Sequence, residues 1–361
     1  MKSVTYFMVL HRIRRNKMPV TINDIAKEAG VSRATVSRVL NDSGYVKYET
    51  RQKVLKAIKE LNYTPSAIAR SLSTKKTNTI GVIVPEINDP FFGEVIKGIS
   101  EVADEYNLNI ILFNTDDNVE KELKALELLK EQRIQGIIIT PTFTEDELNS
   151  EYLKTLENFG IPIILIDGHV KYTSFSGVFI DHIKGAYDGT EALIKAGHKK
   201  IAIINGHMKS RPAKERFIGY KKALSMYNIP LEERYIFYGE YKYENAYNIT
   251  NEILKMKDPP TAIFVSSNMM ILGCIKALYE NKINVPKDIA IIGFDKLEVL
   301  NIIGMNISFI NGPTLELGRT GMKMLIDSLN DKKKKEIRRV ILLPEIVLKG
   351  SEKYVEKNRC E

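Results

Sequence analysis

Residues 32–41 carry hydroxyl and guanidinium side chains that can donate hydrogen bonds in fixed directions. Arg38 can make two parallel hydrogen bonds to O6 and N7 of a guanine, and Arg33 and Ala34 can contact neighbouring bases. For Arg33, a solvated or phosphate-only role is the alternative. The hydroxyl groups in this segment suit phosphates or base edges. They belong to Ser32, Thr35 and Ser37.

Signatures of catalysis or metal binding are missing from the sequence. It contains no GxGxxG, Walker loop, nucleophile elbow or HExxH. The two cysteines, Cys274 and Cys360, can form neither a disulfide framework nor a four-ligand zinc site. The histidines are scattered without metal-ligand spacing, so we expect no enzyme, no metal and no cofactor. They are His11, His169, His182, His198 and His207.

Two short amphipathic helices must hold the 32–41 segment in place. Thr21 can cap the first helix, with Asp24 reaching back as in a capping box. Gly30 stands where that helix ends, and Ser32 can cap the second. The spacing is that of a helix-turn-helix, whose second helix presents its N-terminal residues to the major groove. The predicted buried stripes are Ile22, Ile25, Ala26 and Ala29, then Val36, Val39 and Leu40.

A third amphipathic stretch, TRQKVLKAIKELNY, completes the predicted three-helix unit. Its apolar positions are expected to face inward, while its basic positions face outward toward a phosphate backbone. The inward set is Val54, Leu55, Ile58 and Leu61, and the outward set is Arg51, Lys53, Lys56 and Lys59.

The positive charge of the chain is concentrated at its N-terminal end. Residues 1–79 hold 16 Lys and Arg against 5 Asp and Glu, whereas the remainder holds 37 against 40. A basic unit on a mildly acidic body is typical of a module that binds polyanions, and a solvated basic tail is the alternative. We expect residues 1–18 to be a disordered extension without a signal peptide. The cysteine usage and the lack of a membrane-spanning run predict a cytoplasmic protein with no membrane partner.

From Ile80 onward, apolar runs rich in β-branched residues alternate with amphipathic segments. Examples are IGVIVP, GIIITP, IPIILID, IAIING and IAIIGFD. Continuous apolar strands separated by helices indicate parallel sheets covered on both faces. The pattern restarts near Asp181, so we predict two doubly wound α/β lobes with a cleft between them. Asp295 follows a strand directly, at the sheet edge where ligands gather.

The run VTINDIAKEAGVSRATVSRVLN, with ETRQKVLKAIKELNYTPSAIARSL after it, closely resembles the lactose-repressor and purine-repressor (LacI/GalR) family. The likeness extends through TNTIGVIVPEINDPFF, GHKKIAIING and DIAIIGFD to about Gly350. It implies a body similar to periplasmic sugar-binding proteins, and a hinge helix in PSAIARSL that folds when two protomers sit on DNA. Leu72 would then wedge into the minor groove, an ordinary apolar linker residue being the alternative. The DNA contacts expected are Thr21, Ser32, Arg33, Ala34, Thr35, Ser37, Arg38, Asn41, Ser66, Ala69 and Leu72.

The resemblance also implies an effector site in the cleft. Arg216 and Asp295 would grip hydroxyl groups, unless they pair with each other as plain structure. Pro212, Gly312 and Pro313 depart from the residues common in the family, as do Ser267 and Asn268. The expected effector residues are Asp89, Phe91, Phe92, Arg216, Tyr241, Ser267, Asn268 and Asp295; core packing at a helix start is the alternative for the two phenylalanines.

We therefore predict a dimeric, DNA-binding repressor controlled by a small molecule, a sugar or sugar derivative. The alternatives are a nucleoside- or purine-sensing regulator and a solute-binding protein with the same body. The C-terminal tail, 351–361, is too short for a tetramerising coiled coil. The predicted parts are the helix-turn-helix domain (19–64), the hinge and linker (65–79), a first lobe (80–180 and 311–339) and a second lobe (181–310 and 340–350).

Overall fold

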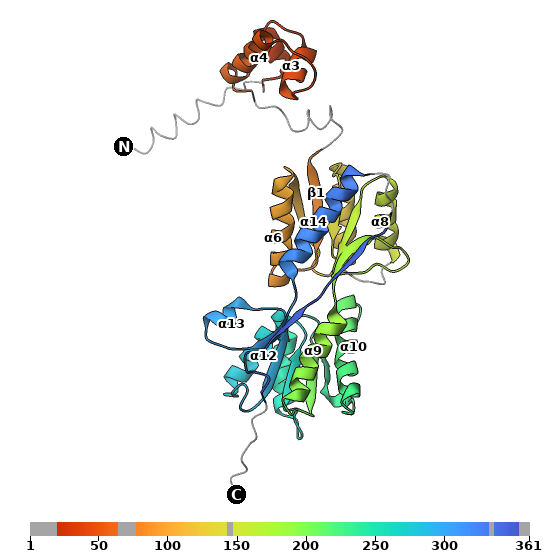
Figure 1. Cartoon of the computed structure of the whole chain (residues 1–361), viewed down its shortest axis with the longest axis vertical. Coiled ribbons are helices and arrows are strands. Elements are labelled where there is room, and N and C mark those ends of the chain that lie inside the picture. The colour runs from red at the N-terminus through yellow and green to blue at the C-terminus, as the bar shows by residue number, and fades with distance from the viewer. Residues whose placement is uncertain (1–19, 64–76, 143–146, 332–335, 354–361) are drawn as a thin grey trace, which may run out of the picture. The chain divides into compact units, whose positions relative to one another are not determined.

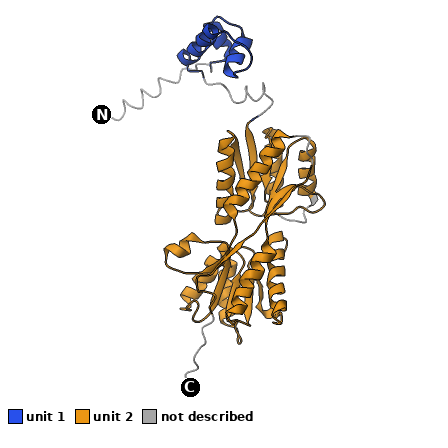
Figure 2. Ribbon diagram, viewed as in Figure 1, with its two compact units in different colours: residues 1–77 blue, residues 78–361 orange. Residues whose placement is uncertain are grey.

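The computed structural model describes residues 20–63, 77–142, 147–331 and 336–353. The chain forms two compact units, residues 1–77 and residues 78–361 (Figure 2). The expected extension at 1–18 and the hinge residues Ser66, Ala69 and Leu72 lie outside the described residues. Only residues 351–353 of the expected tail are described.

The first unit is a three-helix bundle with a small apolar core. Its helices are α2 (Ile22–Glu28), α3 (Arg33–Leu40) and α4 (Tyr48–Glu60). Ile25, Val36 and Val54, one from each helix, are fully buried. The expected inward position of Leu55 is wrong, because its side chain is 45% exposed and Ala57 occupies the buried face instead. The small core thus depends on one tightly buried aliphatic residue per helix.

Local capping fixes the turn between α2 and α3. The backbone N–H of Thr21 donates to Asp24 Oδ2 at 2.8 Å, which closes the predicted capping box. Gly30 ends α2 with a φ of +63°, a left-handed conformation that glycine adopts without steric cost. Ser32 Oγ accepts from the backbone N–H of Thr35 at 3.2 Å and begins α3. These interactions confirm the predicted helix-turn-helix spacing.

The first lobe of the second unit contains a six-stranded parallel sheet in the order β11-β5-β4-β3-β1-β2. Helices α6 and α14 lie on one face of the sheet, whereas α7 and α8 belong to the core of the other. The strands are β1 (Thr79–Val84), β2 (Asn109–Asn114), β3 (Ile137–Ile139), β4 (Ile163–Ile166), β5 (Ser176–Ile180) and β11 (Arg339–Leu342). The helices are α6 (Pro90–Glu105), α7 (Val119–Glu131), α8 (Glu147–Asn158) and α14 (Thr314–Asn330).

The continuous apolar runs are explained by burial on both faces of the sheet. In β1, Ile80, Val82 and Val84 pack in the core beneath α6 and α14, while Ile83 packs in the opposite core. Burying one such side chain contributes about 1.5–3 kcal/mol. A strand that is covered on both sides therefore has no polar alternation, as the sequence pattern predicts.

The second lobe repeats the plan with the sheet order β12-β10-β9-β8-β6-β7. All pairs are parallel except the edge pair β10 and β12. Its strands are β6 (Ile201–Asn205), β7 (Ile236–Tyr238), β8 (Ala262–Val265), β9 (Ala290–Phe294), β10 (Ser308–Asn311) and β12 (Glu345–Val347). Its helices are α9 (His182–Lys195), α10 (Arg211–Met226), η1 (Glu233–Tyr235), α11 (Tyr243–Leu254), α12 (Asn268–Glu280) and α13 (Glu298–Ile302).

The chain crosses between the lobes after β5, after β10 and between β11 and β12. The first two crossings match the expected positions near Asp181 and Ile310. The third was expected near Val340 and falls slightly later in the chain, because β11 pairs with β5, with Leu342 opposite Ile180. Residues 340–342 therefore belong to the first lobe, and the crossing falls at residues 343–344.

Helices α6 and α14 approach each other through two glycines (Figure 1). A Cβ at Gly98 would clash with the backbone carbonyl of Leu315, and one at Gly318 would clash with that of Val95. The close approach therefore requires hydrogen at both positions. Because α6 begins at the interlobe cavity described below, this contact helps to fix the position of its N-terminus.

Candidate nucleic-acid interface and interlobe ligand site

Helix α3 presents a polar face that is free of core contacts. Arg33, Ala34 and Arg38 are exposed, whereas Thr35 and Ser37 are half-buried. The Ser32 and Thr35 hydroxyls share a hydrogen bond of 2.9 Å at the start of the helix. Among the residues proposed to meet DNA, these six lie on or next to a single short helix, as a major-groove reader requires.

The remaining proposed contacts flank that helix. Asn41 follows α3, and its Nδ2 donates to Ser37 Oγ at 3.3 Å. Thr21 caps α2 and is exposed. Both can meet a backbone phosphate, because their polar groups stand at helix termini on the surface.

Helix α4 adds exposed cations to the unit. Lys53, Lys56 and Lys59 are all exposed, so their charges are available to phosphates. Sequence reasoning missed two phenols near the start of this helix: Tyr45 is 87% exposed and Tyr48 is 76% exposed. A phenol hydroxyl can donate to a phosphate, and the unusual exposure of two large side chains is visible only in the structure.

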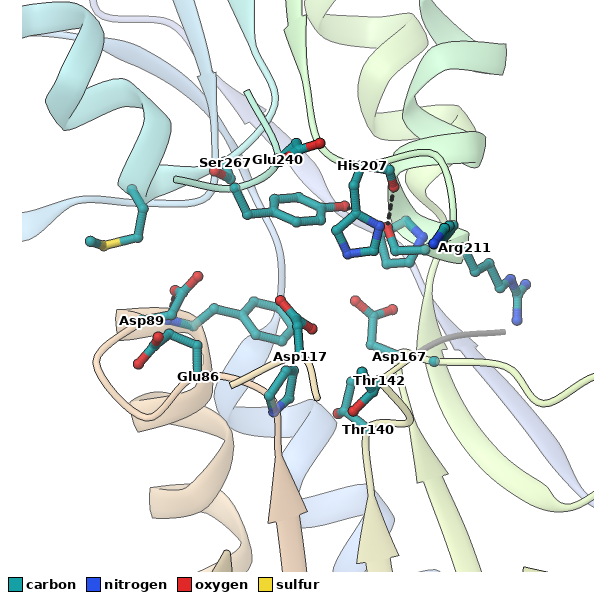
Figure 3. A pocket seen from close by; sticks show the side chains of 18 of the residues that line it. Glu86, Asp89, Asp117, Thr140, Thr142, Asp167, His207, Arg211, Glu240 and Ser267 are labelled. Carbon is teal, nitrogen blue, oxygen red and sulfur yellow. Dashed lines mark hydrogen bonds between the residues drawn. The ribbon is translucent and has the colours of Figure 1, made fainter. Parts of the chain in front are cut away.

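A cavity of about 960 Å³ lies between the two lobes of the second unit. Its volume is at the upper end of the range for small-molecule sites. Loops at the carboxyl ends of strands from both sheets line it (Figure 3). Seven of the eight proposed effector residues line the cavity, namely Asp89, Phe91, Phe92, Arg216, Tyr241, Ser267 and Asp295.

Asn268 is the exception among the proposed effector residues. It is the first residue of α12, it is 1% exposed, and it is not part of the cavity lining. Its Oδ1 accepts from the backbone N–H of Met269 at 2.7 Å, and its side chain interacts with the Asp89 carboxylate, whose pKa it lowers against the larger effect of burial. The neighbouring Ser267 caps α12 and faces the cavity in its place.

Arg216 is held rigidly at the base of the cavity. Its guanidinium lies 3.8 Å from the ring centroid of Phe294, an arrangement that suits a cation over an aromatic face. It also donates to the carbonyl of Ser266. Arg216 Nη2 is 3.8 Å from Asp295 Oδ2, a long ion pair that leaves room for a ligand to share both groups.

A hydrogen-bonded pair joins the two lobes beside Arg216. Asp167 follows β4 in the first lobe, and His182 begins α9 in the second lobe. His182 Nε2 is 2.9 Å and 2.8 Å from the two Asp167 carboxylate oxygens. Arg216 Nε donates to His182 Nδ1 at 3.2 Å, so Nδ1 carries no proton and Nε2–H donates to Asp167.

Asp295 is the most deeply buried carboxylate of the cavity lining outside this pair. It is 7% exposed, and its Oδ1 has no hydrogen-bond partner in the part of the chain that the structure describes. Burial raises the pKa of Asp295 to about 7, although Arg216 favours the ionised form. A buried acceptor without a donor is costly, and a ligand hydroxyl or amine would satisfy it.

Tyr241 lines the second-lobe wall of the cavity, whereas Phe91 and Phe92 line the first-lobe wall. It follows β7 with a φ of +61°, and its ring packs over Gly206, where a Cβ would clash with it. Its hydroxyl shares a hydrogen bond of 2.9 Å with Ser210, and its ring meets that of His207 edge to face. The ring is thus fixed at the cavity wall, where it can cover an apolar face of a ligand.

Several cavity residues escaped the sequence reasoning. Asp117 follows β2, Thr140 follows β3 and Asp167 follows β4, each at the carboxyl end of its strand. The rule that ligands gather at this edge was applied to Asp295, and it could have identified all three. His182 follows β5 in the same way, but its pairing with Asp167 could not be predicted, because the two residues lie on different lobes.

The described residues contain no metal-binding cluster, and their one cysteine, Cys274, is buried. In those ranges, no group of three or more His, Cys, Asp or Glu side chains is arranged to hold a metal ion. Cys274 is buried in the second lobe, and burial raises the pKa of its thiol to about 12. Likewise, no helix within these ranges is long and apolar enough to span a bilayer.

Both parts of the chain match known protein families. Residues 21–66 match the bacterial regulatory proteins of the lacI family. Residues 77–352 match the periplasmic binding proteins and sugar binding domain of the LacI family.

Individual proteins resemble most of the chain. Catabolite control protein A of Priestia megaterium is 37% identical over 87% of this chain and 93% of its own length. A crystal structure of the lac repressor dimer bound to operator and an anti-inducer matches with a TM-score of 0.81 and 27% identity, over 93% of this chain and all of that one. A ribose-bound LacI family regulator from Enterococcus faecium matches with a TM-score of 0.69 and 27% identity, over 77% of this chain and all of that one. The chain described here therefore belongs to the lacI family of bacterial regulatory proteins and is a DNA-binding transcription regulator.

Proposed function

We propose that this protein is a repressor that binds a pseudo-palindromic operator as a homodimer and changes its grip when a small molecule enters the interlobe cavity. The small molecule is a sugar or sugar derivative. The observation that carries the proposal is the presence, in one chain, of an exposed polar face on α3 and a cavity lined by both lobes.

The helix-turn-helix unit, called the head below, carries side chains suited to recognising a DNA sequence. Arg38 and Arg33 are exposed on one short helix whose apolar side is buried. Arginine at such a position suits a bidentate contact to guanine, while Lys53, Lys56 and Lys59 supply attraction to phosphates. One such helix reads one half-site, so two protomers on a two-fold site follow from symmetry. The related lac repressor is a dimer on its operator.

The cavity supports small-molecule control by its construction. Asp295 and Arg216 can each form two directed hydrogen bonds with hydroxyl groups. Phe91, Phe92 and Tyr241 can cover the apolar faces of a ring. The related regulator from Enterococcus faecium holds ribose, and the matching family is described as sugar binding.

Coupling follows from the connections between the lobes. A ligand that contacts both walls favours one angle between the lobes, with the three crossing segments acting as the hinge. The first lobe starts at β1, immediately after the segment that leads to the head. We propose that a change in the angle of that lobe alters the affinity of the DNA-binding unit for its operator.

Two rival functions predict different behaviour. A solute-binding protein for uptake would have no use for a basic helix-turn-helix unit. An enzyme would turn over the compound in the cavity, and we propose that no turnover occurs. We also propose a cytoplasmic location, because a regulator that reads an operator needs access to the chromosome.

Selection from a pool of random duplexes tests the proposal. At physiological ionic strength, the full chain should enrich a motif with two related half-sites, and light scattering should give twice the chain mass of 41.1 kDa. Repeating the selection with compounds that raise the melting temperature should change the yield of that motif. Failure to enrich any motif, with or without those compounds, would refute the proposed function.

A further inference from the structure

The two walls of the interlobe cavity differ in charge. The lining residues of the first lobe include five carboxylates and, among the described residues, no lysine or arginine. The lining of the second lobe has more cations than anions, with two carboxylates, Glu240 and Asp295. The first-lobe carboxylates are Glu86, Asp89, Asp116, Asp117 and Asp167.

Two of these five carboxylates already have partners. Asp116 forms an ion pair with Lys121, and Asp167 accepts from His182 and from the backbone N–H of Ile180. Their charges are thus satisfied by the protein itself. They leave three other carboxylates on the first-lobe wall to be explained.

Glu86, Asp89 and Asp117 form no ion pair within the described ranges. Glu86 accepts from the backbone N–H of Asn88, and Asp89 accepts from that of Phe91. Asp117 has no hydrogen bond to any described residue. Figure 3 shows all three on the same side of the cavity. Lys242 acts on Asp117 and Arg216 acts on Asp89 from a distance, but neither forms an ion pair with these carboxylates, so negative charge is concentrated on this wall.

Asp295 is independent evidence that the cavity accommodates a ligand with a hydrogen-bond donor. It projects from the second lobe, it is more than nine-tenths buried, and its Oδ1 has no hydrogen-bond partner in the described part of the chain. Burial also raises the pKa of Asp117 to about 6, with Glu86 as the next cause. A bound cation would compensate for the cost of keeping these groups ionised.

The arrangement favours an organic cation over a metal ion. No three acidic or imidazole groups of the described residues converge as metal ligands do. The same cavity is lined by Phe91, Phe92 and Tyr241, which suit a ring, and by the hydroxyls of Thr140 and Ser210. The charge, the aromatic surface and the hydroxyl groups point to a single class of ligand.

We propose that the effector is a polyhydroxylated ring bearing an ammonium group, as in an amino sugar. The ammonium lies against Glu86, Asp89 and Asp117, and hydroxyls of the ring donate to Asp295. The proposal rests on the proposed function of the cavity as the effector site, and it narrows the effector from sugars in general to cationic ones.

Matched sugar pairs test the charge requirement. The full chain is titrated at neutral pH with glucosamine and glucose, and with galactosamine and galactose, while binding is followed by the melting temperature and by calorimetry. N-acetylglucosamine serves as the uncharged control that keeps the nitrogen. At least one amine should bind about tenfold more tightly than both its neutral counterpart and the acetylated form, since a charged hydrogen bond adds this much or more.

Variants locate the effect at the acidic wall. Glu86→Gln with Asp117→Asn should bring the ratio of the amine affinity to the neutral-sugar affinity close to one. Asp104→Asn, on the exposed side of α6, is the matched control and should keep the preference. Circular dichroism should show the double variant folded, because the substitution removes like charges.

The outcomes separate the two proposals. A neutral sugar that binds as tightly as its amine, or a failure of every amine to bind, overturns the inference about the ligand. If the same preparation still enriches a duplex motif, only the ligand class is wrong and the regulator function stands. If DNA selection fails as well, the proposed function falls with it.

Discussion

Asp167 and His182 are joined across the boundary between the two lobes, with both carboxylate oxygens within 2.9 Å of the imidazole Nε2. Both side chains are almost completely buried. The far side of the ring accepts from Arg216, so Asp167 after β4, His182 in α9 and Arg216 in α10 form one continuous hydrogen-bonded path. A ligand that draws Arg216 toward itself would act on this path, which links the cavity to the hinge.

Replacing Asp167 with asparagine should weaken this link. Asparagine keeps an oxygen for the backbone N–H of Ile180, but it loses the negative charge and the second carboxylate oxygen that faces His182 Nε2. We expect a loss of about 1–3 kcal/mol in the free energy of unfolding, measured by urea denaturation. Asp104→Asn on exposed α6 should change the free energy by less than about 0.5 kcal/mol. Equal effects of the two variants would contradict the structural role of Asp167.

Two glycines of α6 should respond in opposite directions to the same substitution. Gly98→Ala introduces a Cβ against the carbonyl of Leu315 in α14, so the helices must separate and the melting temperature should fall. Gly93→Ala places its Cβ in open space. It should stabilise the protein by about 0.4–1 kcal/mol, because alanine favours the helix. Stabilisation by both substitutions, measured by thermal denaturation, would show that the close approach of α6 and α14 is not required.

Arg38→Ala should reduce sequence discrimination. We expect a loss of about 1–3 kcal/mol on the selected duplex and a relaxed preference at one base position, measured by fluorescence anisotropy. Lys56→Ala should weaken binding to specific and random duplexes alike and reduce the dependence on salt by about one unit of slope. If Arg38→Ala lost the same affinity on both duplexes, its role would be limited to phosphate binding.

The acidic wall should make stability depend on pH. The pKa of Asp117 is raised to about 6 by burial and by Glu86, with Asp116 adding to the rise and Lys242 opposing it. The folded protein then holds a proton that the unfolded chain has released, so this contribution is present at low pH and lost as the pH rises through about 6. Asp117→Asn should flatten the fall in melting temperature between about pH 4 and pH 7, the range in which the folded chain holds this proton and the unfolded chain does not. A variant that stays parallel to the wild type over this range would argue against the raised pKa.

Local signals in the sequence were sufficient to predict the head. Thr21, Gly30 and Ser32 each interact with residues no more than about one helical turn away, so their capping roles follow from spacing alone. The helical pattern failed at Leu55, because the apolar face of α4 is wider than the small core that it covers, and the smaller Ala57 faces that core instead. Which of two apolar positions is buried depends on the neighbouring helices and not on the period.

Long-range relationships were predicted less well. The sequence pattern of residues 339–342 would suit a strand of either lobe. Only their pairing with β5 assigns them to the first lobe. Asp117 could have been found from its place after a strand, whereas the bond between Asp167 and His182 depends on how two lobes meet. The proposed preference of the cavity for positive charge likewise depends on which carboxylates lack ion-pair partners, and this is visible only in the folded structure.

The most direct test is the ratio of two dissociation constants for the full-length protein, measured by anisotropy at about 0.15 M salt. One is for the duplex enriched by selection, and the other is for the same duplex with scrambled half-sites. The account predicts a preference of about 10³-fold or more for the intact site. Affinities that agree within a few-fold, both alone and in the presence of the amino sugars tested above, would contradict it.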